Sequence, residues 1–250
     1  MITDLTLFTC NYNNEDLTLH MLTSFYIQLG YYIPNIILDN SDITPLSENI
    51  TKNCKVIDNQ NYKITKNYGN ISKNHCAAID YVIKNLVTTK YVLLCDNDIL
   101  FKPEIKLLLN LRHYYDCIGE INFDWCKPER LYPYCCLIDV EKFKNEKLNY
   151  FDDKRCIITL DKGIFYDVIN NGKKVNIENR YLYDTGASFY EDIKNKWNIL
   201  NIDLSKFIVH YKNGSQLDDR NNLINKYDMD FGYKTINEFF TKNKKYFTYA

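Results

Sequence analysis

Asp96 and Asp98 stand two positions apart, directly after the apolar run Tyr91–Cys95, which predicts a buried strand. In an extended segment these two side chains share a face, and their carboxylates would repel one another if left alone. A divalent cation that carries a diphosphate would relieve this repulsion, because Mg²⁺ and similar hard cations favour one or two protein carboxylates together with phosphate oxygens. The pair therefore predicts a metal and phosphate site at the end of a strand.

The position of this triplet matters more than its composition. Chance alone gives about two Asp-x-Asp triplets in a chain with this Asp content. The second triplet, Asp228 and Asp230, follows no apolar run, and we interpret it as a solvated turn. For the first triplet, the alternative interpretation is a strand-to-helix turn in which Asp98 caps backbone amides.

Strand and helix patterns alternate through the first half of the chain. Residues 4–10 are apolar and β-prone, and a helical pattern follows with Leu17, Met21 and Phe25 at four-residue spacing. Residues 35–38 predict a second strand, which ends in a turn-rich polar cluster. Polar residues also follow the predicted strands at residues 4–10 and 91–95, so the three polar clusters are expected to gather at one edge of a sheet.

The next segment continues the same rhythm. From His75 onward, apolar residues recur at the spacing of an amphipathic helix, and Pro103 is expected at the first position of another helix. This order predicts an α/β fold with a mixed, mainly parallel sheet flanked by helices, and ligands in such sheets bind beyond the carboxyl ends of the strands. No repeat or linker divides the chain, so we expect a single domain over residues 1–250.

Composition excludes some classes of function. Thirty-one basic and 32 acidic residues give a net charge of −1, which provides no basic surface for nucleic acid. The nine cysteines show no zinc-type spacing, and no stretch reaches the ~18 apolar residues of a membrane span. With no signal-peptide pattern at the start, we expect a cytoplasmic protein. The basic segment 242–247 would allow peripheral membrane association, although a solvated helix end explains it equally simply.

Four segments together resemble one enzyme family. Residues 7–13 resemble its first strand and turn, 36–42 its second strand ending, 74–80 the start of its donor-side helix, and 91–101 its Asp-x-Asp segment. In this order and spacing the chain resembles the nucleotide-sugar-dependent glycosyltransferases of the GT-A (Rossmann-like) fold, of the family-2 type. The resemblance implies a donor half at 1–105, an acceptor half at 106–250, and Mn²⁺ or Mg²⁺ as cofactor.

The resemblance also implies roles for donor-side residues. Asp39 is similar to the acid that accepts a hydrogen bond from a uracil or guanine base, and Thr9 and Asn11 would line the nucleotide pocket. Asp96 is similar to the residue nearer the ribose, and Asp98 to the direct metal ligand. The implied donor is a UDP-sugar, with a GDP-sugar as the alternative, and the implied acceptor is a hydroxyl of a glycan, a protein or a lipid.

Two histidines are further candidates. His75 is followed by Cys76, where the family usually has glycine, so that side chain is expected to narrow the donor pocket; the alternative is a helix-cap histidine that touches no ligand. His210 ends a short β-like run, and a late histidine completes the metal site in many related enzymes. A neutral imidazole suits Mn²⁺, while the alternative is a buried structural histidine. His20 and His113 lie in predicted helices, and we interpret both as structural.

The family's inverting members use an acid as general base, and its usual Glu-Asp pair is absent here. Asp184, before a predicted helix containing Phe189, Ile193 and Trp197, is the expected base, with Asp124 as the alternative. Two other functions stay open: an inactive module that binds a glycan or nucleotide, and a sugar-phosphate nucleotidyltransferase. The latter normally has a Gly-rich loop with a basic residue after its first strand, whereas residues 9–14 contain neither.

Overall fold

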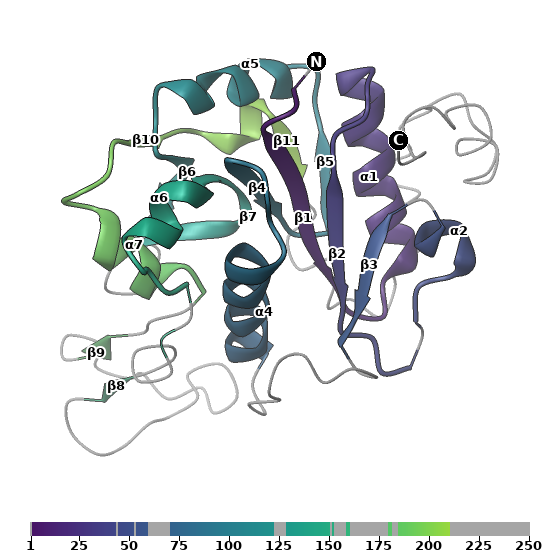
Figure 1. Cartoon of the computed structure of the whole chain (residues 1–250), viewed down its shortest axis with the longest axis horizontal. Coiled ribbons are helices and arrows are strands. Elements are labelled where there is room, and N and C mark those ends of the chain that lie inside the picture. Colours follow the sequence, from purple (N-terminus) through teal and green to yellow (C-terminus); the bar gives the residue numbers. More distant parts are fainter. Residues whose placement is uncertain are drawn as a thin grey trace, which may run out of the picture.

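The computed structural model describes residues 2–43, 45–52, 54–59, 71–122, 129–150, 152, 159–160, 180–181 and 185–210. In this part of the chain, a seven-stranded sheet carries helices on both faces (Figure 1). Its strands lie in the order β10-β6-β7-β4-β1-β2-β3. They are β1 (Leu5–Asn11), β2 (Asn35–Asp39), β3 (Lys55–Asp58), β4 (Tyr91–Cys95), β6 (Cys117–Asn122), β7 (Arg130–Asp139) and β10 (Ile199–Asn201).

Neighbouring strands of this sheet are parallel except at β7, which runs antiparallel to both β4 and β6. The predicted mixed, mainly parallel sheet with flanking helices is therefore confirmed. Two small antiparallel pairs lie outside it. They are β5 (Ile99–Phe101) with β11 (Ile208–His210), and β8 (Thr159–Leu160) with β9 (Arg180–Tyr181).

The helices agree with the sequence patterns at most positions. The predicted helix after β1 is α1, and the amphipathic segment around His75 is α4, which begins four residues before that histidine. The described helices are α1 (Glu15–Leu29), α2 (Glu48–Thr51), α4 (Ile71–Asn85), α5 (Ile105–Asn110), α6 (Val140–Asn145) and α7 (Ala187–Ile193), with 3₁₀ turns η1 (Leu111–His113) and η2 (Leu204–Lys206).

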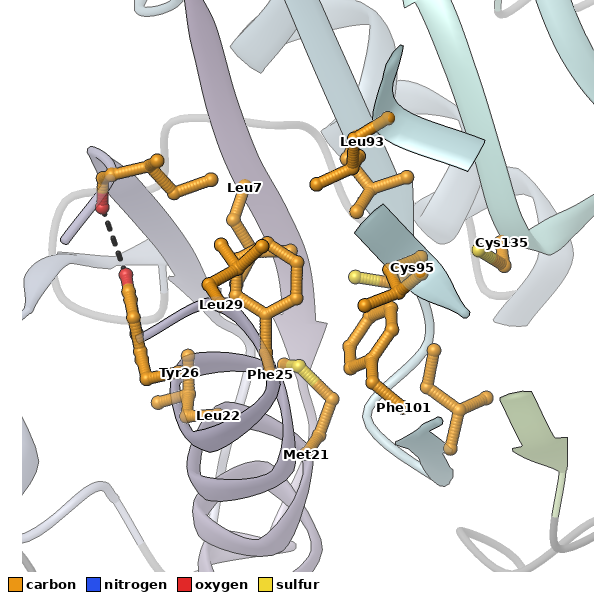
Figure 2. Close-up of a cluster of buried hydrophobic side chains, with 14 of the residues drawn as sticks. Leu7, Met21, Leu22, Phe25, Tyr26, Leu29, Leu93, Cys95, Phe101 and Cys135 are labelled. Atoms are coloured by element: carbon orange, nitrogen blue, oxygen red, sulfur yellow. Dashed lines mark hydrogen bonds between the residues drawn. The ribbon is translucent and has the colours of Figure 1, made fainter. Parts of the chain in front are cut away.

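Helix α1 covers one face of the sheet. Its buried apolar residues, which include Met21, Leu22 and Phe25, pack against Leu7 of β1 and Leu93 of β4 (Figure 2). Each such side chain contributes about 1.5–3 kcal/mol when it is fully buried. The four-residue spacing read from the sequence thus places the helix, and the helix in turn fixes the β1–α1 turn at the carboxyl edge of the sheet.

Helix α4 covers the opposite face. Ile79, Val82 and Ile83 are fully buried and belong to the same apolar cluster as Phe8 of β1 and Leu94 of β4. Because alternate residues of β1 point to opposite faces, Leu7 and Phe8 supply the two separate cores. Both central strands are therefore buried on both sides, as their nearly continuous apolar sequences indicate.

The sequence interpretation was wrong in two details. Pro103 does not occupy the first helical position, because α5 begins at Ile105 and residues 103–104 form a turn. The expected helix through Trp197 ends earlier, at Ile193, and Trp197 is buried after the helix end. In the second case, apolar side chains that meet in the core gave the periodic pattern without a continuous helix.

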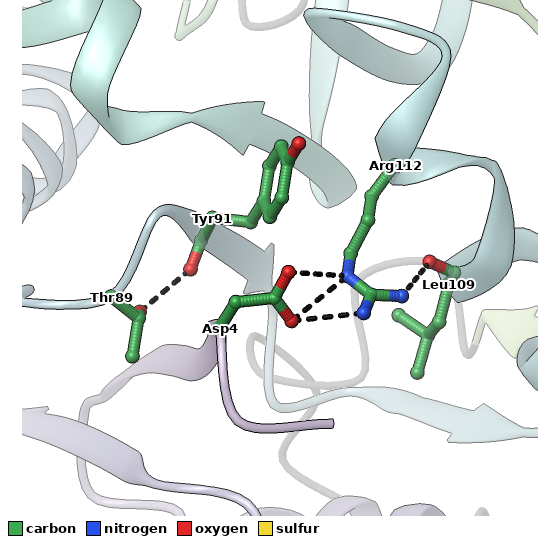
Figure 3. A network of polar contacts seen from close by, with 5 residues as sticks. All are labelled: Asp4, Thr89, Tyr91, Leu109 and Arg112. Atoms are coloured by element: carbon green, nitrogen blue, oxygen red, sulfur yellow. Dashed lines mark hydrogen bonds and ion pairs between the residues drawn. The ribbon is translucent and has the colours of Figure 1, made fainter. Parts of the chain in front are cut away.

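A charged pair ties down the end of β1 that lies opposite the carboxyl edge. The Arg112 guanidinium donates to both oxygens of Asp4, at 2.9–3.3 Å, and to the Leu109 carbonyl at 2.8 Å (Figure 3). Beside it, the Thr89 hydroxyl donates to the Tyr91 carbonyl at the start of β4.

Within the described ranges, none of the helices combines the length and the hydropathy that a bilayer crossing requires.

Candidate metal site at the carboxyl edge of the sheet

Asp96 and Asp98 form the turn between β4 and β5. The Asp96 amide donates to the Tyr134 carbonyl of β7 at 3.1 Å, so the turn begins while the chain is still bonded to its antiparallel neighbour. Strand β5 starts directly afterwards, at Ile99, and pairs with β11 so that Ile99 lies opposite His210. This register brings His210 beside Asp98 from a distant part of the sequence.

The three side chains offer a compact set of ligand atoms. One oxygen each of Asp96 and Asp98 and one imidazole nitrogen of His210 all lie within 4.8 Å of one another. The His210 Nε2 atom is 3.4 Å from Asp98 Oδ1. The Asp98 side chain is 5% exposed, whereas His210 and Asp96 are 27% and 29% exposed, so the cluster opens to solvent on one side.

Asp98 shows that this cluster suits a cation. Its Oδ1 atom is buried and accepts no hydrogen bond from the described residues. A buried carboxylate oxygen that makes no hydrogen bond is costly; His210 Nε2 lies 3.4 Å away, and a metal ion that both groups bind would remove this cost. Two carboxylates and one imidazole form a donor set suited to Mn²⁺, and Mg²⁺ also accepts one or two protein carboxylates.

Asp96 differs from Asp98 in its surroundings. Desolvation by the surrounding protein raises the pKa of Asp96 and the Asp98 carboxylate adds to this, while His75, His210 and Arg130 act in the opposite direction. The partly exposed carboxylate therefore lies among three groups that are or can become positive. These neighbours favour the charged form of the carboxylate, while burial and Asp98 oppose it, so a bound cation would stabilise the charged pair further.

His75 lies beside Asp96, with its Nε2 atom 3.6 Å from Asp96 Oδ1. It occupies the second turn of α4, so the alternative of a helix-cap histidine is wrong. Its Nε2 atom is buried and has no hydrogen-bond partner among the described residues. The neighbouring Cys76 points into the core under α4 and is buried there.

Asn11 and Asp39 meet at the ends of β1 and β2, where they are paired in register. The Asn11 Nδ2 atom donates to Asp39 Oδ1 at 2.9 Å and to Ser41 Oγ at 2.9 Å. Among the described residues, Asp39 Oδ1 also accepts from the Ser41 amide and hydroxyl, and Oδ2 accepts from the Leu46 amide at 3.1 Å. Asp39 thus organises the turn after β2.

Thr9 stands apart from this cluster. It is buried inside β1, between Ile37 of β2 and Cys95 of β4, two residues before the end of β1. Asp184 and Asp124 lie outside the described residues.

Sequence reasoning missed the groups that support His210. The Tyr134 ring stacks on the His210 ring, with centroids 4.5 Å apart and an interplanar angle of 14°. The Tyr134 hydroxyl donates to Glu120 Oε2 at 2.6 Å. A pocket of about 380 Å³ lies beside them, and its lining includes Lys102, Glu120, Tyr134 and His210. One face of the Tyr134 ring is therefore covered by His210.

No protein-family model matches this sequence, and no curated protein matches it. Solved structures do match. The glycosyltransferase GlyE of Streptococcus pneumoniae superposes on 98% of this chain, with 15% identity and a TM-score of 0.55. The galactosyltransferase LgtC covers 56% of this chain (15% identity, TM-score 0.42), and residues 1–349 of S. aureus TarS cover 59% (13% identity, TM-score 0.40).

The match spans only part of these structures: 65% of the GlyE chain, 59% of LgtC and 50% of the TarS fragment. The likeness to GlyE nevertheless extends over nearly all of this sequence. It agrees with the sheet described above, in which β7 runs antiparallel within an otherwise parallel arrangement and the acidic turn follows β4. The chain therefore has the GT-A fold.

Proposed function

We propose that the protein is a metal-dependent glycosyltransferase that transfers a sugar from a nucleoside diphosphate to a hydroxyl acceptor. The observation that carries this proposal is the convergence of Asp96, Asp98 and His210 within 4.8 Å at the carboxyl edge of a GT-A sheet. Ligands of open α/β sheets bind at this edge. The donor is proposed to be a UDP-sugar, with a GDP-sugar as the alternative.

In this proposal, Asp98 and His210 hold Mn²⁺ or Mg²⁺ directly and Asp96 lies nearer the ribose. When bound, such a cation neutralises the charge that develops on a leaving diphosphate. The protein's own contribution is to present the ligands in advance. Asp98 is buried and fixed between two strands, and His210 is held against the Tyr134 ring.

The nucleotide is proposed to lie across the ends of β1 and β2, along Thr9, Asn11 and Asp39. Asp39 Oδ2 accepts one hydrogen bond from the described residues, that of the Leu46 amide, and a carboxylate oxygen has room for a second. It is the atom proposed to accept the N–H of a uracil or guanine ring. His75, beside Asp96, would border the donor on the α4 side.

The acceptor hydroxyl, from a glycan, a protein or a lipid, would attack the sugar from the face opposite the diphosphate, which inverts the anomeric centre. By the family resemblance, Asp184 is the proposed base that takes the hydroxyl proton, with Asp124 as the alternative. A cytoplasmic location is part of the proposal. It is supported by the seven described cysteines, all of which are free thiols.

The structure disfavours a sugar-phosphate nucleotidyltransferase. Residues 12–14 link β1 to α1 and contain no glycine and no basic side chain to cradle a triphosphate. An inactive binding module of the same fold is the remaining alternative. It would not need a buried Asp98 oxygen that accepts no hydrogen bond from the described residues and lies 3.4 Å from an imidazole nitrogen.

A thermal-shift series with Mn²⁺ and UDP, and then GDP, tests the proposal. We expect one nucleotide to raise the melting temperature only when Mn²⁺ is present, since a ligand at about 100 times its Kd adds about 2.7 kcal/mol of stability. Asp98→Asn, which keeps the side-chain size, should remove the shift. An equal shift in EDTA would refute the metal assignment. Release of the nucleoside diphosphate from a nucleotide sugar then separates an enzyme from a binding module.

A further inference from the structure

We propose that Asn97, the middle residue of the acidic triplet, is a positioning residue that fixes Asp96 and Asp98 for metal binding. This inference rests on the proposed metal site. The Asn97 side chain is directed into the protein rather than toward the cluster, and the residue is only 5% exposed. Its Nδ2 atom donates to Asn11 Oδ1 at 3.2 Å and to Thr18 Oγ1 at 3.1 Å.

These contacts form a closed network. The Thr18 hydroxyl donates to the same Asn11 Oδ1 atom at 2.8 Å, so Asn97, Asn11 and Thr18 bond to one another in a triangle. The other end of the Asn11 amide donates to Asp39. All four residues are buried, and they come from the β4–β5 turn, β1, α1 and β2.

The network supplies what the turn itself lacks. Of the three residues 96–98 between β4 and β5, Asp96 is still bonded to β7 through its amide, whereas Asn97 and Asp98 belong to neither strand. Two buried hydrogen bonds from the Asn97 side chain hold this part of the turn against α1 and β1. Groups that orient metal ligands in this way are worth about 10–100-fold in metal affinity.

The same triangle links the two ends of the proposed donor site. Asn11 bonds on one side to Asn97, between the metal ligands, and on the other to Asp39, at the proposed nucleotide end. All hydrogen bonds of this network are buried, so water cannot replace one that is lost, and a change in one member displaces its neighbours. The spacing between the cation and the base is thus set by one continuous polar network.

Titration of the protein with Mn²⁺ alone, followed by the EPR signal of free Mn²⁺, tests the inference. Asn97→Leu keeps the approximate size and removes both donors, and we expect about 10-fold to 100-fold weaker Mn²⁺ binding. The matched control is Asn35→Leu. Asn35 is 2% exposed and its Nδ2 atom donates to the Tyr26 hydroxyl at 3.0 Å, but it lies at the opposite end of β2.

The control should lose thermal stability but bind Mn²⁺ within about twofold of the wild type. Wild-type affinity in Asn97→Leu, or an equal loss of affinity in both variants, overturns the inference. If Asn97→Leu does not fold, Thr18→Val and Thr18→Ser decide. Weaker binding in the valine variant with recovery in the serine variant supports the inference, and wild-type affinity in both overturns it. Absence of Mn²⁺ binding by the wild type instead refutes the metal site of the proposed function, and the inference with it.

Discussion

His210 Nε2 lies 3.4 Å from Asp98 Oδ1, because the antiparallel pairing of β11 with β5 sets His210 opposite Ile99. The contact joins the residue before β5 to the last residue of β11. An acid at the end of an interior strand thereby acquires a nitrogen ligand from a distant segment. The Tyr134 ring stacks on the His210 imidazole, and the Tyr134 hydroxyl donates to Glu120.

Removal of this imidazole should weaken metal binding. We expect His210→Ala to bind Mn²⁺ at least about tenfold more weakly, since even groups that only orient a ligand are worth that much. Isothermal titration with Mn²⁺ measures the effect. His113→Ala is the matched control, because His113 lies in η1 and its ring meets the edge of Tyr91 at 6.0 Å, away from the carboxyl edge. Unchanged affinity in His210→Ala would remove this residue from the site.

Asp98→Asn should make the metal-free protein more stable. The buried Oδ1 atom accepts no hydrogen bond from the described residues, and an unsatisfied charged group costs about 1–3 kcal/mol. For a domain of this size that corresponds to about 2–4 °C in melting temperature per kcal/mol. The measurement is a thermal melt in EDTA. With saturating Mn²⁺ the order should reverse, and a lower melting temperature of the variant in EDTA would show that the contact with His210 outweighs the cost of the buried charge.

Asp39→Asn should destabilise the fold. The Asp39 carboxylate accepts hydrogen bonds from Asn11, from Ser41 and from the Leu46 amide. In the variant, the side-chain NH₂ group would replace one of the two acceptor oxygens and would face hydrogen-bond donors. We expect a loss of about 2–4 kcal/mol in urea unfolding, since several buried donors lose their acceptor. Ser41→Ala removes only the hydroxyl and should cost less. Equal stability of Asp39→Asn and the wild type would contradict the described network.

Gly186 and Gly30 provide a matched pair of substitutions. Both have a positive φ, +88° and +76°, so a side chain strains the backbone in each case. A Cβ atom at Gly186 would lie 2.0 Å from the Leu131 carbonyl oxygen, whereas one at Gly30 meets nothing within 4 Å. We expect Gly186→Ala to cost about 2–5 kcal/mol, and Gly30→Ala about 1–2 kcal/mol.

Denaturant unfolding of the two alanine variants measures the difference directly. Both variants carry a similar cost of placing a side chain at positive φ. The difference between their losses in free energy of unfolding therefore reports how closely the start of α7 approaches β7. Equal losses in the two variants would mean that the carbonyl of Leu131 moves aside without cost.

The sequence by itself determined the elements that build the site. The four-residue spacing of Leu17, Met21 and Phe25 gave α1, and the apolar run Tyr91–Cys95 gave β4 with an acidic turn after it. These features follow from local periodicity, since a helix repeats every 3.6 residues and a strand every two, and each buries one set of apolar side chains. The alternation of such elements was sufficient to predict the α/β sheet and its ligand-binding edge.

Only the tertiary structure decided which groups meet at that edge. The β-like run that ends at His210 predicts β11 but not its partner, and the pairing of β11 with β5, which places His210 beside Asp98, depends on packing against α1. In the same way, Asn97 looks like any residue of a turn until Asn11 and Thr18 surround it. Contacts between distant segments are chosen by burial and by satisfaction of polar groups across the whole fold, and neither quantity is encoded in a single stretch of sequence.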